Sequence, residues 1–341
     1  MNTFIKRPAG EREEIFYQTA QHLNMEPAAV EKDFWVCWVL RELFRSPLAH
    51  SVIFKGGTCL SKVYGLIDRF SEDIDLILNW SGAEIVKEWQ SSDGKVGRKK
   101  VMEALDEWNV IQVAGTILPT VQQFCGELCS ASVPEKTPEV VLINYPRIFE
   151  SAYIRPEIKL EIGPKAAWDP NEAHVIKPYI AEQYPHLLND AEVEVRATSA
   201  ERAFWEKVTI LHAQAQRPSE LPERYARHYY DVVMMARNIA LKQRAYADVE
   251  LLYRVASFKH YFYRAGWADY PNAKPGSMHL MPDGHIMENL RLDYASMKAE
   301  MLPADAPSLE CVLGELKTLE AEVNALKPLP LHISNYPDMQ P

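Results

Sequence analysis

The sequence predicts an α/β (or α+β) fold in which a mixed sheet is followed by a mostly helical C-terminal domain. Residues 51–78 have the order strand, glycine turn, helix, strand. Residues 154–163 alternate apolar and polar side chains, as a half-buried strand does. From Thr198 the pattern changes to a helix start followed by apolar residues at helical spacing. The predicted domains are an α/β domain with N-terminal helices at 1–196, a helical domain at 197–330 and an extended tail at 331–341.

Two helices are expected before the first strand. Residues 10–23 carry apolar side chains at helical spacing, and Pro27 suits the first turn of a second helix. The run from Val30 to Phe44 is apolar on several sides, which predicts a central buried helix. Glu31-Lys32-Asp33 is expected at its polar edge, with Lys32 solvated or ion-paired.

Further along, residues 98–130, 245–300 and 305–327 have helical patterns. Val140-Val141-Leu142-Ile143 reads as a strand, and residues 191–196 alternate like another. These elements complete the expected sheet and the helical C-terminal part.

A phosphate site is predicted where the first strand ends. Gly56 and Gly57 allow unusual backbone angles and a close approach of a ligand. Thr58 is a plausible N-cap of the helix that follows, whose first N–H groups and positive dipole end favour a phosphate. Ser61 and Lys62 add a hydroxyl and a cation.

Two carboxylates follow on the second strand. Asp73 and Asp75 are two residues apart, so they share one strand face, while Ile74 and Leu76 point into the core. Two carboxylates beside a phosphate-binding turn predict a site for Mg²⁺, which would bridge triphosphate oxygens. The alternative is a purely structural role. An Asp-x-Asp pair on its own is usually solvated, and a Gly-Gly pair on its own is usually just a turn.

Taken together, Gly56-Gly57-Thr58, Leu60-Ser61-Lys62 and the run from Phe70 to Leu76 resemble the signature of the AbiEii/AbiGii-type nucleotidyltransferase toxins. These belong to the DNA polymerase β-like nucleotidyltransferase superfamily. The resemblance implies a polymerase β-like nucleotidyltransferase domain, and its motifs extend from about residue 30 to residue 235.

The resemblance also implies roles for residues outside this core. A third metal carboxylate would be Glu161, with Glu157 on the same strand face as the alternative. Lys207 would contact the triphosphate, although a plain surface lysine is the other interpretation. Asp231 matches the functional aspartate of the family, and would orient Lys207 or accept the proton of the nucleophile. Arg224 and Arg227 bracket Asp231 and are candidates for bidentate phosphate contacts.

The implied activity is a Mg²⁺-dependent transfer, with Mn²⁺ as a possible substitute, of a nucleoside monophosphate from an NTP to a hydroxyl. The implied biology is a toxin of a toxin–antitoxin or phage-defence pair that modifies a tRNA 3′ end and has a cognate antitoxin. Nucleotidylation of a protein or a small molecule is an alternative, and so is a non-catalytic nucleotide-binding module.

Composition sets further limits. Among 341 residues no apolar run is long enough to span a bilayer, so no membrane partner is expected. Five cysteines without zinc-type spacing predict a reduced, cytoplasmic protein. The net charge of −10 argues against bulk nucleic-acid binding. A basic cluster of Lys95, Arg98, Lys99 and Lys100 reads as a solvated face, or alternatively as an RNA-backbone contact.

Overall fold

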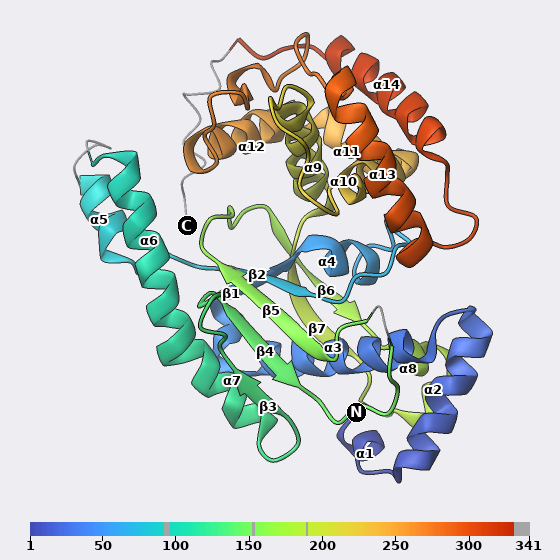
Figure 1. The fold of residues 1–341 in the computed structure, drawn as a ribbon. Coiled ribbons are helices and arrows are strands. Elements are labelled where there is room, and N and C mark those ends of the chain that lie inside the picture. Colours follow the sequence, from blue (N-terminus) through green and yellow to red (C-terminus); the bar gives the residue numbers. More distant parts are fainter. Residues whose placement is uncertain (92–95, 152–153, 189, 331–341) are drawn as a thin grey trace. The chain divides into compact units, whose positions relative to one another are not determined.

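The computed structural model divides the chain into two compact units (Figure 1). It describes residues 1–91, 96–151, 154–188 and 190–330. The predicted tail at 331–341 and Lys95 of the basic cluster therefore lie outside the described residues. The first unit holds residues 1–63 and 70–198, and the second holds 64–69 and 199–341. The short segment 64–69 thus groups with the C-terminal unit.

A seven-stranded mixed sheet forms the first unit, in the order β3-β4-β5-β2-β1-β7-β6. The β5–β2 and β1–β7 pairs are parallel and the others are antiparallel. The prediction of an α/β fold with a mixed sheet is therefore confirmed. The strands are β1 (Val52–Lys55), β2 (Ile74–Leu78), β3 (Ser130–Ser132), β4 (Val140–Asn144), β5 (Glu157–Gly163), β6 (Asn171–Ile176) and β7 (Val193–Thr198).

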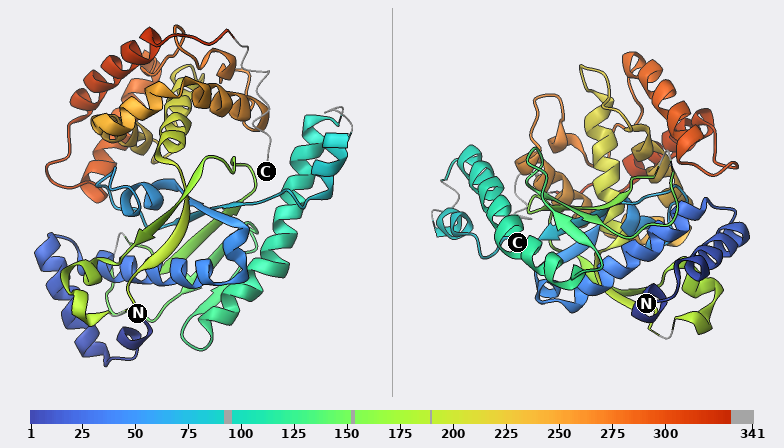
Figure 2. Two further views of the ribbon diagram at one scale, coloured as in Figure 1. Left: turned by 180° about the vertical axis from the view of Figure 1, so that it is seen from behind. Right: turned by 60° about the horizontal axis from the view of Figure 1, so that its bottom comes forward.

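Helices flank this sheet, and α3 lies across one of its faces, in contact with β5 and β7 (Figures 1 and 2). The predicted helical run after residue 98 is interrupted by a π-helical turn at Val113–Ile117. Asn109 ties this run to the sheet by donating to the carbonyl of Ile162 at 3.0 Å. The helices are α1 (Asn2–Ile5), α2 (Ala9–Leu23), α3 (Pro27–Arg45), α4 (Gly56–Lys62), α5 (Glu84–Ser91), α6 (Arg98–Gln112), α7 (Leu118–Cys125) and α8 (Tyr179–Gln183), with a short 3₁₀ helix at Pro47–His50 and another at Pro185–Leu187.

The central helix α3 is buried, as predicted, but its charged residues are not at a polar edge. Glu31 and Lys32 are each 1 % exposed and Asp33 is 9 % exposed. Burial of a charge is tolerated where partners compensate it, and each of these three side chains has partners on a different segment of the unit. The expectation of a polar edge was therefore wrong, because the sequence does not show these distant partners.

The second unit is helical in its described residues, as predicted. Helix α9 is its centre and contacts α10, α11 and α12, while α13 and α14 pack on α10. Ser199 caps α9 by accepting from the backbone N–H of Arg202 at 3.3 Å. The helices are α9 (Ala200–Ala215), α10 (Ala226–Arg237), α11 (Ile239–Ala247), α12 (Val249–Phe262), α13 (Gly284–Glu300) and α14 (Leu309–Ala325), with a 3₁₀ turn at Tyr270–Asn272.

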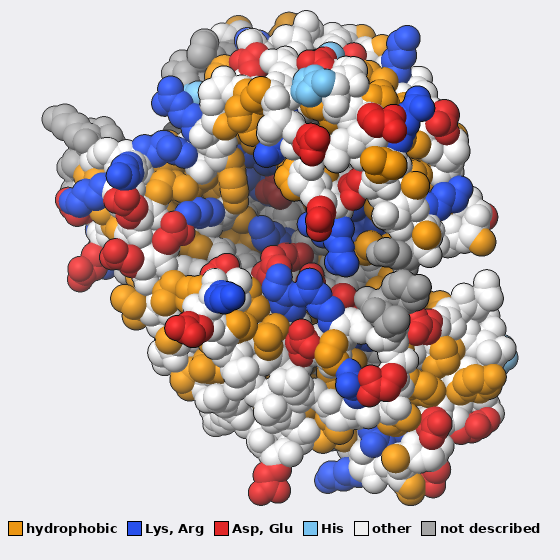
Figure 3. Space-filling model, in the orientation of Figure 1, with side chains coloured by type: hydrophobic (Ala, Val, Ile, Leu, Met, Phe, Trp, Pro, Cys, Tyr) orange, Lys and Arg blue, Asp and Glu red, His pale blue; other side chains and the backbone are white. Residues whose placement is uncertain are grey.

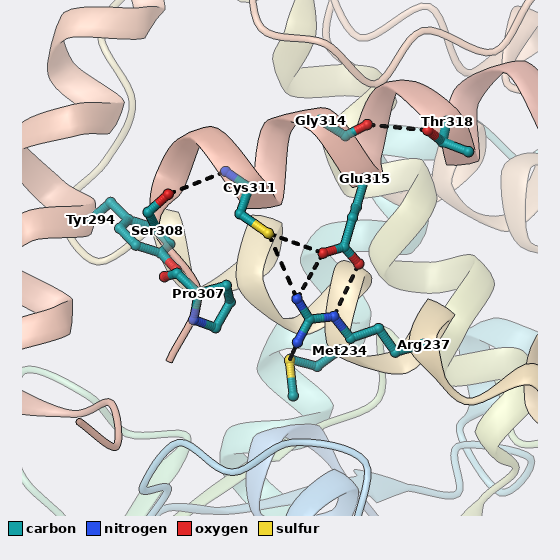
Figure 4. Close-up of polar contacts among 9 residues, drawn as sticks. All are labelled: Met234, Arg237, Tyr294, Pro307, Ser308, Cys311, Gly314, Glu315 and Thr318. Atoms are coloured by element: carbon teal, nitrogen blue, oxygen red, sulfur yellow. Dashed lines mark hydrogen bonds and ion pairs between the residues drawn. The ribbon is translucent and has the colours of Figure 1, made fainter. Parts of the chain in front are cut away.

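An arginine fork joins α10 to α14 (Figure 4). Arg237 donates to both carboxylate oxygens of Glu315, at 2.9 and 2.7 Å, and the thiol of Cys311 donates to Glu315 at 3.3 Å. Arg237 is 41 % and Glu315 37 % exposed, so solvent screens this pair. It therefore orients the two helices more than it stabilises them.

All five cysteines are free thiols in the structure, and Cys37 and Cys59 are buried. No helix among the described residues is long and apolar enough to cross a membrane.

The surface over α5 and α6 mixes positive and negative side chains (Figure 3). Lys99 lies 3.6 Å from Glu103, and Lys100 lies 2.8 Å from Glu88. The two lysines are 88 % and 63 % exposed. Within the described part of the basic cluster this arrangement is a solvated face of mixed charge, so the RNA-contact interpretation gains no support here.

Candidate active site

Gly56 is required by a close contact with Asp75. It follows β1 directly and has a φ of +83°, in the left-handed region that favours glycine. A Cβ atom built on Gly56 would lie 1.8 Å from Oδ2 of Asp75, 2.6 Å from its Cγ and 2.9 Å from its Cβ. The carboxylate of Asp75 therefore occupies the space that any other residue at position 56 would fill.

Strand pairing places further charged residues beside Asp75. In the parallel β2–β5 pair Asp75 is opposite Glu161, and in the antiparallel β1–β2 pair it is opposite Lys55. Asp73 precedes β2 by one residue, so alternation gives it the same face as Asp75. The sheet thus pairs two predicted carboxylate positions, Asp75 and Glu161, and a place for Asp73 on the same face stays a prediction from the strand spacing.

The third carboxylate has a partner of its own. Glu161 forms an ion pair with Lys159, two residues earlier on the same face of β5, and its side chain is 42 % exposed. In the described residues, no group of three His, Cys, Asp or Glu side chains is arranged to hold a metal ion. The donor set that fits a hard divalent cation is therefore the oxygen pair of Asp73 and Asp75, and a role for Glu161 requires it to leave Lys159.

The hydroxyl groups of the glycine turn contact the protein itself. Thr58 is 4 % exposed, and its hydroxyl donates to the carbonyl of Asp73 at 2.5 Å and lies 3.0 Å from the hydroxyl of Ser71. The Ser61 hydroxyl lies 3.3 Å from the carbonyl of Gly57. Thr58 thus anchors the backbone that leads into β2. The groups of this turn that could still contact a phosphate are its backbone N–H groups and, after rotation of its side chain, the hydroxyl of Ser61.

Lys62 is buried in an ion pair. Its Nζ lies 2.7 Å from Oδ1 of Asp33, and its ammonium is 3.6 Å from the ring centroid of Tyr179. Although burial lowers the pKa of Lys62, the carboxylate of Asp33 raises it above its ordinary value, so the lysine is charged. A role of Lys62 in binding phosphate stays a prediction, since its ammonium is paired with Asp33 in this structure.

A separate charged group forms the polar centre of the second unit. Asp231 of α10 is 0 % exposed and accepts from Arg69 Nε at 2.7 Å and Nη2 at 2.8 Å. Lys207 of α9 donates to the same carboxylate at 2.8 Å. Burial raises the pKa of Asp231, but the two cations outweigh this effect and hold the pKa below its ordinary value. The pKa of Lys207 lies below its ordinary value, because the effect of burial exceeds the opposing effect of the Asp231 carboxylate.

The start of α10 is held by Asp293. Its carboxylate accepts from the backbone N–H of Arg224 at 2.7 Å and of Ala226 at 2.6 Å. Arg224 has a φ of +60°, and the side chains of Arg224 and Arg227 are exposed. Burial, followed by the charges of Lys207 and Arg227, lowers the pKa of His228 well below its ordinary value. His228 is therefore neutral at pH 7.

Three contributors were not predicted. Arg69 stands 162 positions from Asp231, and no local pattern marks it. Glu72 pairs with Lys32 at 3.2 Å, again across distant segments. Lys55 could have been predicted from the sequence, because it ends the first strand and an antiparallel β1–β2 pairing places it opposite Asp75.

A family model described as the nucleotidyl transferase AbiEii toxin of type IV toxin–antitoxin systems matches residues 38–321. No curated protein matches the chain. Among solved structures the chain is similar to MenT4, a nucleotidyltransferase toxin from Mycobacterium tuberculosis H37Rv, with 15 % identity, a TM-score of 0.45, and coverage of 91 % of this chain and 99 % of that one. The resemblance inferred from the glycine and aspartate motifs is confirmed. Because the family match extends over most of its length, this chain belongs to the AbiEii nucleotidyltransferase toxins of type IV toxin–antitoxin systems.

Proposed function

We propose that this toxin transfers a nucleoside monophosphate from an NTP to a hydroxyl group at a tRNA 3′ end. The observation that carries the proposal is the carboxylate of Asp75 lying over Gly56, with Asp73 on the same face and Glu161 opposite in the pairing register. A glycine turn that leads into a helix supplies backbone donors for phosphate, and the aspartates supply hard oxygen donors beside it.

Asp73 and Asp75 would hold Mg²⁺, or Mn²⁺, because both ions take carboxylate oxygen ligands. When bound, such an ion neutralises phosphate charge and activates the attacking hydroxyl. The backbone N–H groups of Gly56, Gly57 and Thr58, with the Ser61 hydroxyl, would bind the triphosphate.

In the transfer, the acceptor oxygen bonds to the α-phosphorus, and the bond from that phosphorus to the bridging oxygen of the β-phosphate breaks. Pyrophosphate leaves, and the hydroxyl proton passes to a carboxylate. We assign this proton to Glu161, once its carboxylate has left the ion pair with Lys159, because Asp231 is buried and its lowered pKa makes it a weak base.

Asp231 would instead orient Lys207, which we propose as a donor to phosphate oxygens. Arg224 and Arg227 are exposed forks suited to the same chemistry. The toxin–antitoxin family implies a cognate antitoxin as partner.

The test is incubation of the protein with Mg²⁺, one α-labelled NTP at a time, and total tRNA or cell lysate. Label on tRNA supports the proposal and identifies the nucleotide. Label on a protein band assigns the acceptor to protein instead, and label on a small molecule does the same for that class. A folded sample that labels nothing contradicts the proposed transfer and favours a nucleotide-binding module.

A further inference from the structure

Helix α3 presents three consecutive buried charges to three different parts of the first unit. Successive helical residues are rotated by about 100°, so Glu31, Lys32 and Asp33 point in different directions. Glu31 accepts from the backbone N–H groups of Ile148, at 2.8 and 3.0 Å, and of Phe149, at 2.9 Å. Asp33 pairs with Lys62. Lys32 is the one whose contacts reach the segments directly beside Asp73 and at the start of β5.

The ammonium of Lys32 joins two segments that flank the carboxylates. It donates to the carbonyl of Arg155 at 2.9 Å and to the carbonyl of Glu157 at 2.6 Å, where β5 begins. It also lies 3.2 Å from Oε2 of Glu72, the residue directly before Asp73. Glu72 Oε2 in turn accepts from the backbone N–H of Arg155 at 3.0 Å. One cation and one carboxylate therefore tie α3, the approach to β2 and the start of β5 together.

Asp73 lies inside this set of contacts. Its carbonyl accepts from the Thr58 hydroxyl, its predecessor Glu72 is held by Lys32, and its successor Ile74 is paired with Leu160 of β5. The backbone is thus fixed on both sides of Asp73. The fixed point on the N-terminal side, Glu72, depends on Lys32 because Glu72 is only 15 % exposed and needs a countercharge.

We propose that Lys32 is a positioning residue that sets the place of Asp73, through Glu72, relative to the β5 strand that carries Glu161. This inference rests on the proposed function, since it assigns Lys32 to the geometry of the divalent-cation site. Lys32 touches neither the substrate nor the cation in this role. Residues that hold metal ligands in place typically change metal affinity by about 10- to 100-fold when they are removed.

The test compares two variants of the full chain. The two side chains that are replaced are equally buried, but they contact different segments of the first unit. Lys32→Met removes the ammonium and keeps the length of the side chain. Glu31→Gln is the matched control, because Glu31 is also 1 % exposed on the same helix, and its three hydrogen bonds go to Ile148 and Phe149, which carry none of the candidate site groups. Free Mn²⁺ measured by electron paramagnetic resonance gives the Kd of each folded protein without any turnover.

The expected result is a Kd for Mn²⁺ that is about tenfold or more higher in Lys32→Met than in wild type. In Glu31→Gln the Kd stays within about twofold even though the Tm falls. Raising the metal concentration restores transfer by Lys32→Met, which a general structural defect does not allow. Should Lys32→Met fail to fold, Glu72→Gln carries the same expectation, since its amide oxygen can still accept from Arg155 but lacks the charge that pairs with Lys32.

Folded Lys32→Met, or folded Glu72→Gln, that binds Mn²⁺ as wild type does overturns the positioning role while leaving the proposed function intact. An equal loss of affinity in Glu31→Gln overturns it too, because the effect would then be one of general stability. Wild-type protein that binds no Mn²⁺ contradicts the metal site itself, and the inference falls with it.

Discussion

Two aspartates of this chain have opposite surroundings. Asp75 lies on a strand with its carboxylate over a glycine, beside residues that strand pairing brings into register. Asp231 is completely buried in the second unit and is enclosed by the guanidinium of Arg69 and the ammonium of Lys207. The difference teaches what each carboxylate is suited to. Asp75 occupies space that is open because Gly56 has no side chain. Asp231 holds two cations in fixed positions.

The sharpest way to break this comparison is Asp75→Ala. If Asp75 supplies a cation ligand, we expect transfer to fall by about 10²- to 10³-fold, the scale on which loss of a charge-stabilising group acts. The fold should persist, because shortening a side chain over Gly56 creates no clash. Rates with labelled NTP, together with circular dichroism, measure both effects. An active, folded Asp75→Ala variant is incompatible with the metal assignment.

Replacement of the other aspartate should act first on stability. Asp231→Asn leaves two buried cations without their carboxylate, so we expect the free energy of unfolding to fall by about 3–5 kcal/mol. The control is Glu315→Gln, which removes the charge from a half-exposed arginine pair of the same unit (Figure 4) and should cost about 1 kcal/mol or less. Urea unfolding measures both. Similar losses in the two variants would remove the distinction between buried and screened pairs.

Acid should separate the two aspartates further. Arg69 and Lys207 hold the pKa of Asp231 below its ordinary value, so the stabilisation is present in full above pH ~4. It is lost progressively as the pH falls from there toward the folded-state pKa, because the unfolded chain then binds a proton that the folded chain resists. We expect the urea midpoint of wild type to fall more steeply than that of Asp231→Asn between pH 5 and pH 3. Parallel slopes would contradict this linkage.

The same comparison explains what the sequence predicts well. Gly56, Asp73 and Asp75 lie in one strand–turn–helix–strand segment, so period-two alternation and the glycine turn are enough to indicate their arrangement. The mixed sheet and the start of α9 follow from equally local patterns. Lys207 and Asp231, 24 residues apart, were identified only through the family resemblance. Arg69 was missed because its contact with Asp231 depends on packing between segments that stand 162 residues apart.

Burial of charge is the other feature that local patterns do not give. Glu31-Lys32-Asp33 has the composition of a solvated helix edge, yet all three are buried by backbone groups and side chains from distant positions. Likewise, the sequence offers Lys62 as a phosphate ligand, whereas its cation is paired with Asp33. A charge pattern therefore predicts exposure only where no distant segment supplies a partner that covers it.

Gly56→Ala tests the steric half of the comparison. The new Cβ would displace the Asp75 side chain, so we expect a cost of about 1–3 kcal/mol and a large loss of metal affinity. Gly65→Ala is the matched control, since Gly65 also has a positive φ, +59°, but nothing lies within 4 Å of its Cβ position. It should show the backbone strain alone, about 1–2 kcal/mol. Mn²⁺ binding that is equal in both variants would mean that Gly56 serves only its backbone conformation.

The smallest effect is expected where charges are exposed. The double variant Lys99→Ala/Lys100→Ala removes two ion pairs of α6 whose lysines are 88 % and 63 % exposed. Each such pair contributes about 0.5 kcal/mol or less, so the unfolding midpoint should barely change. Transfer to tRNA should stay within about twofold, because the neighbouring Glu88 and Glu103 already offset these cations. A KM for tRNA raised about tenfold, with kcat unchanged and a weaker salt dependence, would instead identify α6 as an RNA-backbone contact.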